Sequence, residues 1–262
     1  MIPDLALTSV ITWDDLHKKK NLSEFFDYVE KTKPSFSPLL RGLNYHNTLD
    51  YFTHTKYKNS TPGYAYASIT PELEDLVKKG FNVSDERVRA SSHNAIESGV
   101  EFHILKDDPS LRDLVKDSIN EADMEGLSKL LGSFFKKPED EMLKSLHILF
   151  SFATKYELVK LDGWVDLFEE LNRYYLKAET NRDLARKALE LSFEITKNTY
   201  KEFIESSIAS GDTEIKDCNY FDFGLGFWGS GWEYRLFCRC FFGSGRRGFF
   251  YDRRFFNNWR FY

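Results

Sequence analysis

A histidine and a glutamate one helical turn apart are the best candidates for chemistry in this sequence. His93 and Glu97 stand four residues apart, so on a helix their side chains share one face. Imidazole nitrogens and carboxylate oxygens are ligands for zinc and similar divalent metals. With Glu101 and His103 just beyond, we take His93, Glu97 and His103 as candidate metal ligands, to be completed by distant residues. The sequence favours the alternative, a capping or surface histidine near a helix that ends at Gly99.

A second pair of histidines has the spacing of two helical turns. His46 and His54 could share one helix face, with Asp50 between them. No nucleophile or cysteine accompanies them, so this pattern favours a structural role. The sequence contains no recognisable set of nucleophile, base and orienting group, and we therefore predict no catalytic residue and no cofactor.

The cysteines are confined to the end of the chain. Cys218, Cys238 and Cys240 all fall in the last 45 residues, which excludes a disulfide framework for the rest of the protein. Cys238 and Cys240 lack a second pair of metal ligands, because no histidine follows His147. We therefore predict no zinc site built locally in this segment.

The composition changes abruptly near residue 218. Residues 219–262 hold an aromatic residue at 18 of 44 positions, with seven arginines and no lysine, whereas residues 1–218 contain 22 lysines. Aromatic doublets such as Phe241-Phe242 and Phe255-Phe256 fit neither a two-residue nor a 3.6-residue period. We predict that this tail is unordered or collapsed without regular pairing.

Three explanations of the tail remain open. Arginine and aromatic side chains stack on nucleic-acid bases, and they are also favoured anchors in protein interfaces. Alternatively, a slip of the reading frame near Asp217 replaced the evolved sequence, which would otherwise be rich in small and aliphatic residues. The candidate contact residues for a partner or a nucleic acid are Trp228, Trp232, Arg235, Arg239, Arg246, Arg247, Arg253, Arg254, Trp259 and Arg260.

The elements that must position these residues are predicted to be helices. Residues 1–67 read as a mixed helical and loop region, 68–211 as a helical bundle and 212–262 as the tail. Thr70-Pro71 and Asp108-Pro109 are typical helix starts, and Gly80 is a typical helix end. The last and longest predicted helix, opened by Thr180, carries an apolar stripe that includes Leu191. The fold class is mainly α, an irregular helical bundle or array with a mixed N-terminal region.

Composition limits the function classes. The chain of 262 residues is 42% hydrophobic and 29% charged with a net charge of -5, which does not indicate polyanion binding by the whole chain. No apolar run approaches the roughly 20 residues of a membrane span. The first residues lack the basic start of a signal peptide, so we predict a cytoplasmic protein.

The sequence thus favours a non-enzymatic helical interaction or regulatory protein, with a protein partner or self-association and no small-molecule substrate indicated. One alternative is a membrane-acting helical protein whose C-terminal hydrophobic element is masked by a frame slip. The other is a nucleic-acid-associated protein that binds through residues 219–262. Salt-sensitive binding that disappears when the tail is deleted would favour this last class.

Overall fold

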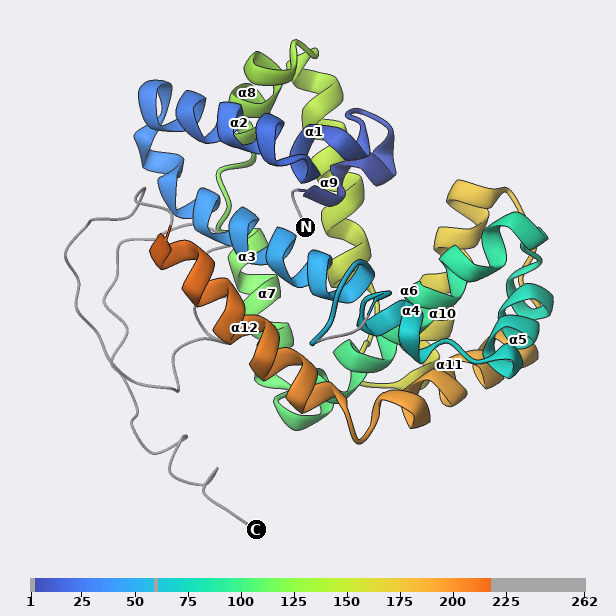
Figure 1. The fold of residues 1–262 in the computed structure, drawn as a ribbon. Helices are drawn as coiled ribbons and strands as arrows, with labels where there is room; N and C mark the ends of the chain where they lie inside the picture. The colour runs from blue at the N-terminus through green and yellow to red at the C-terminus, as the bar shows by residue number, and fades with distance from the viewer. Residues whose placement is uncertain (1–2, 59–60, 218–262) are drawn as a thin grey trace.

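The computed structural model describes residues 3–58 and 61–217, and within these ranges every regular element is a helix (Figure 1). The elements are η1 (Pro3–Thr8), α1 (Trp13–His17), α2 (Lys19–Thr32), η2 (Pro34–Phe36), α3 (Ser37–His54), α4 (Tyr64–Ser68), α5 (Pro71–Phe81), α6 (Asp85–Asp107), α7 (Ser110–Asn120), α8 (Met124–Phe135), α9 (Glu139–Lys155), α10 (Leu161–Leu171), η3 (Asn172–Leu176), α11 (Arg182–Thr196) and α12 (Tyr200–Asp217). The predicted α class is confirmed. The tail and its tryptophan and arginine candidates lie outside the described residues.

Local signals account for several helix ends. The Thr70 hydroxyl accepts a hydrogen bond from the Leu73 N–H at 3.2 Å, as expected for the cap that begins α5. The helix passes through Gly80 and ends at Phe81, and the next residue, Asn82, adopts a left-handed conformation with φ of 52°. The prediction that Gly80 ends α5 was therefore wrong, and asparagine takes that role because it tolerates this conformation.

Gly99 does not end a helix either, because α6 continues through it to Asp107. Here α6 crosses α11 so closely that a Cβ on Gly99 would lie 2.6 Å from the Thr196 hydroxyl and 2.7 Å from the Ser192 carbonyl oxygen. The glycine permits this approach of two helices. As a result His93, Glu97 and Glu101 belong to one uninterrupted helix.

The last predicted helix is two helices. α11 ends at Thr196 and α12 begins at Tyr200, then runs past the predicted end of the helical body at Gly211 to Asp217. The buried face of α11 includes Ala188, Leu189 and Phe193, while Leu191 is only half-buried at its edge. The helix is thus rotated slightly from the predicted phase.

Two hydrophobic clusters form the core. One joins α4, α5, α6, α10, α11 and α12 with the end of α9, and includes Leu73, Ile96 and Leu189. The other joins η1, α1, α2 and α3 with α8 and α9, and includes Phe25 and Leu146. This second cluster draws on both sides of the predicted division at residue 67. None of the helices in residues 3–58 and 61–217 has the length and apolar character needed to cross a bilayer.

Helix α3 connects the two clusters. In Figure 1 it runs through the middle of the molecule, with α12 along its side and α6 near its C-terminal end. Its N-terminal half packs Leu39, Leu40 and Leu43 into the second cluster. Its C-terminal half carries His46, Asp50 and His54 at four-residue spacing, and His54 at the end of the helix contacts Glu97 of α6.

Candidate metal centre

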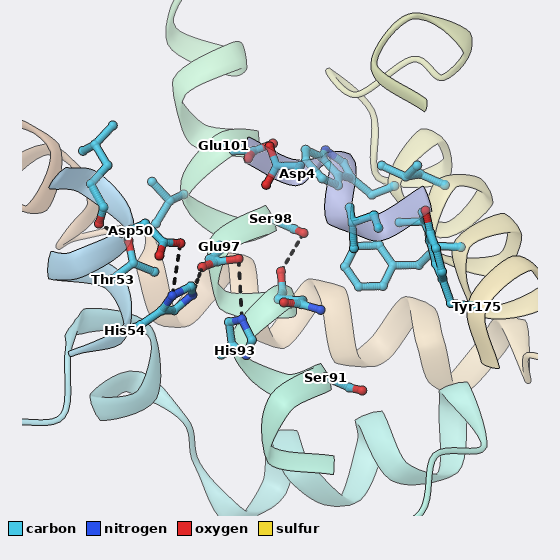
Figure 2. Close-up of a pocket in the computed structure, with 18 of the residues that line it drawn as sticks. Asp4, Asp50, Thr53, His54, Ser91, His93, Glu97, Ser98, Glu101 and Tyr175 are labelled. Atoms are coloured by element: carbon cyan, nitrogen blue, oxygen red, sulfur yellow. Dashed lines mark hydrogen bonds and ion pairs between the residues drawn. The ribbon is translucent and has the colours of Figure 1, made fainter. Parts of the chain in front are cut away.

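A cavity of about 910 Å³ lies where α3 and α6 meet η1, α1, α10, η3 and α12 (Figure 2). Most of its lining is aliphatic or aromatic. The polar part consists of histidines, carboxylates and a few neutral groups, and none of the described lining residues is lysine or arginine. The histidines and carboxylates of the lining are Asp4, His46, Asp50, His54, His93, Glu97 and Glu101.

Helical periodicity places the polar residues in two rows. His46, Asp50 and His54 are spaced four residues apart on α3. The same spacing relates His93 and Glu97 to Glu101 on α6. Because four residues are slightly more than one turn, each row lies along one face of its helix. Figure 2 shows the two rows approaching each other at His54 and Glu97.

His54 joins the two helices through both ring nitrogens. Its Nδ1–H donates to Asp50 Oδ1 at 3.1 Å, and its Nε2–H donates to Glu97 Oε1 at 2.8 Å. Burial opposes a charge on this ring, but the hydrogen bonds to Asp50 and Glu97 outweigh burial and raise the pKa of His54 to about 10. Without a metal, His54 is therefore an imidazolium between two carboxylates at neutral pH.

His93 completes this first cluster. Its Nε2 lies 3.9 Å from Glu97 Oε2, and its ring centroid lies 4.8 Å from that of His54. Burial lowers the pKa of His93, so its ring is neutral at neutral pH. One ligand atom from each of His54, His93 and Glu97 lies within 4.8 Å of the others, and this set could hold a divalent cation.

A second cluster lies at the other end of the α3 row. Ligand atoms of His17, at the end of α1, and of His46 and Asp50 lie within 4.8 Å of one another. Burial lowers the pKa of His46 to about 4, which keeps its ring neutral. Asp4 Oδ1 lies 3.8 Å from His46 Nε2 and is a further oxygen donor beside the cluster.

Glu101 lies one turn beyond Glu97. Desolvation by the neighbouring protein groups, together with the charge of Glu97, raises the pKa of Glu101 to about 7. A carboxyl group with such a pKa can both accept and donate a proton at neutral pH. Figure 2 shows Glu101 beside Asp4, away from His54.

The structure brings together only part of the predicted set of metal ligands. His93 and Glu97 share the first cluster, but His103 lies elsewhere, because six residues after Glu97 correspond to a rotation of about 240° around the helix. Its Nε2–H donates to the Phe193 carbonyl oxygen at 2.7 Å, and its ring stacks on Tyr200. His103 is thus part of the packing between α6, α11 and α12.

The sequence alone did not predict that His54 lies beside His93 and Glu97, or that His17 lies beside His46 and Asp50. A usable signal was present, namely the two rows of chelating side chains at four-residue spacing on two different helices. Taken without the other, each row favours a structural role for its histidines.

Comparison of the chain with protein-family models, curated proteins and solved structures finds no match.

Proposed function

We propose that this protein is a metal-dependent hydrolase that acts on uncharged esters with an apolar group. The observation that carries this proposal is the set of His54, His93 and Glu97 on the wall of a large, mainly apolar cavity. Three protein ligands with a remaining open position are the pattern of catalytic zinc sites. When bound, a divalent cation supplies Lewis-acid activation of water and of the ester carbonyl.

The surroundings of His54 support a role as a metal ligand. Histidines that bind metals usually donate their second ring N–H to a carboxylate or a carbonyl, which fixes the ring and its tautomer. His54 does this through Nδ1–H and Asp50, leaving Nε2 directed at Glu97. Ligation requires the loss of the proton on Nε2, so metal binding here should release a proton.

Glu101 is suited to proton transfer during hydrolysis. In ester hydrolysis, water adds to the carbonyl carbon, the acyl–oxygen bond breaks, and an acid and an alcohol are formed. Glu101 lies in the same cavity with a pKa of about 7. It can accept the proton of the attacking water and return that proton to the departing alkoxide, so that no net charge accumulates.

The lining of the cavity indicates the substrate class. Its described part offers no lysine or arginine to bind a phosphate or a carboxylate. Aromatic and aliphatic residues such as Trp164 and Phe168 instead provide surface for an apolar group.

Metal binding by the full chain is the first test. The cysteines must be removed as a background, because thiolates bind zinc, and the triple variant C218S/C238S/C240S serves for this purpose. We expect calorimetric titration with Zn²⁺ to show binding in this background. Glu97→Gln and His93→Ala should each weaken zinc binding at the site of His54, His93 and Glu97 at least tenfold, whereas His147→Ala, an exposed histidine on α9, should have no effect.

Hydrolysis is the second test. We expect the zinc-loaded chain to hydrolyse p-nitrophenyl butyrate, a neutral ester, in preference to p-nitrophenyl phosphate, and a chelator to abolish the activity. Glu101→Gln should lower kcat while leaving zinc binding intact. Absence of zinc binding, or binding unaffected by both Glu97→Gln and His93→Ala, would refute the proposal, and a preference for the phosphate would refute the substrate class.

The hypotheses that rest on residues 219–262 stay predictions. Nucleic-acid binding, docking through tail aromatics and a masked hydrophobic element all concern residues outside the described ranges. The same holds for the predicted protein partner and for the cytoplasmic location, on which the metal cluster has no bearing. A non-enzymatic interaction role likewise stays a prediction, and the hydrolysis assay separates it from the function proposed above.

A further inference from the structure

Outside the first cluster, the two ring nitrogens of His17 lie in different environments. Its Nδ1 lies 2.8 Å from the Trp13 carbonyl oxygen, and since a carbonyl can only accept, Nδ1 carries the hydrogen. In the neutral ring, Nε2 therefore holds a lone pair. This Nε2 is buried and has no hydrogen-bond partner among the residues that the structure describes.

Leaving such a nitrogen unsatisfied is unfavourable. A buried polar atom without a partner destabilises the fold, and native structures contain few of them. The ring is also held in place, because it stacks on Trp13 with 4.1 Å between centroids. A fixed tautomer with Nδ1–H bonded to a carbonyl is the arrangement found in histidines that bind metals.

The neighbours of His17 supply the other donors of a cation site. The His46 ring lies 5.7 Å from the His17 ring, and ligand atoms of His17, His46 and Asp50 come within 4.8 Å of one another. Asp4 stands 3.8 Å from His46. Two imidazoles with one or two carboxylates are a donor set suited to zinc and to similar first-row metals.

Asp50 connects this site to the first cluster. Its Oδ1 accepts the hydrogen bond of His54, while its carboxylate also belongs to the set with His17 and His46. The same residue can therefore bind one cation directly and orient a ligand of the other. The carboxylate of Asp50 and the ring of His54 would thus lie between the two cations and couple their binding.

We infer that His17, His46 and Asp50 form a second divalent-cation site, which Asp50 links to the first through its hydrogen bond with His54. This inference rests on the proposed function for its chemistry, but two of its ligands belong to no other site. An experiment can therefore refute the second cation site without refuting the first, and the reverse.

The number of zinc ions per chain tests the inference in the C218S/C238S/C240S background. We expect two ions per chain after dialysis, one in His17→Ala, one in His93→Ala and none in the double variant. Cobalt substitution should give the d–d absorption of nitrogen and oxygen ligands. Circular dichroism checks that each variant keeps its helices, and histidine-selective NMR of the chain with His17 intact should show its Nε2 resonance shifting as the second ion binds.

Each outcome decides between the assignments. Two ions retained in His17→Ala, or a single ion that only His93→Ala removes, would overturn the second site and leave the proposed function standing. A single ion that only His17→Ala removes would support this second site and refute the first. An unshifted His17 resonance at full zinc loading would overturn the second site even if His17→Ala failed to fold.

Discussion

Raising the pH of the metal-free protein should destabilise the fold chiefly through His54. The pKa of this residue is about 10 in the folded protein, against an ordinary value of 6.5 that applies to the unfolded chain. The folded state thus binds the proton more tightly. The resulting stability is fully present below pH 6.5 and is lost as the pH rises through about 10.

The magnitude follows from the same difference in pKa. At 1.36 kcal/mol for each pH unit, the interval from 6.5 to about 10 corresponds to an upper limit of about 5 kcal/mol. About a quarter of the His54 side chain is exposed, at 24%, so solvent screens its ion pairs with Asp50 and Glu97. We therefore expect a loss of about 2–3 kcal/mol in the free energy of unfolding, roughly half of that limit.

Urea unfolding followed by circular dichroism measures this loss, with a chelator present and the pH varied across the interval. The control is His54→Gln, which keeps hydrogen-bonding capacity but cannot take up the proton. Its free energy of unfolding should depend much less on pH in this range. If wild type and His54→Gln lose stability in parallel, the alkaline transition belongs to other groups, and the account of His54 as an imidazolium between two carboxylates is wrong.

Three further predictions concern the fold, and urea titration of each variant measures all of them. Gly99→Ala should destabilise the protein by about 1–3 kcal/mol, because the new Cβ would stand 2.7 Å from the Ser192 carbonyl oxygen where α6 crosses α11; unchanged stability would mean that the crossing is looser. Asp123→Ala should cost about 1 kcal/mol by removing the N-cap hydrogen bond of α8, and Asp123→Asn should restore most of it. Leu189→Asp should destabilise more than Leu191→Asp, since only Leu189 is fully buried, and the reverse order would show that α11 is phased as its apolar stripe suggested.

Much of the helical structure could be predicted from local sequence. The start of α5 at Thr70-Pro71 and the bounds of α8 depend on residues within one turn of the helix end, so they are visible without a tertiary context. The role of a glycine, by contrast, depends on tertiary packing and could not be predicted locally. Gly80 and Gly99 read as helix ends, but each lies inside a helix where another helix approaches closely, and only packing shows which role a glycine has.

The sequence by itself determined the two rows of chelating side chains, because helical periodicity alone aligns His46 with Asp50 and His93 with Glu97. It could not determine that the rows meet. That depends on which faces of α3 and α6 pack together, and this choice is made by burying apolar surface elsewhere on both helices. The role of each histidine ring likewise depends on the tertiary structure. His54 becomes a cation because two carboxylates reach it across the helix contact, whereas His103, also on α6, serves only to pack against α11 and α12.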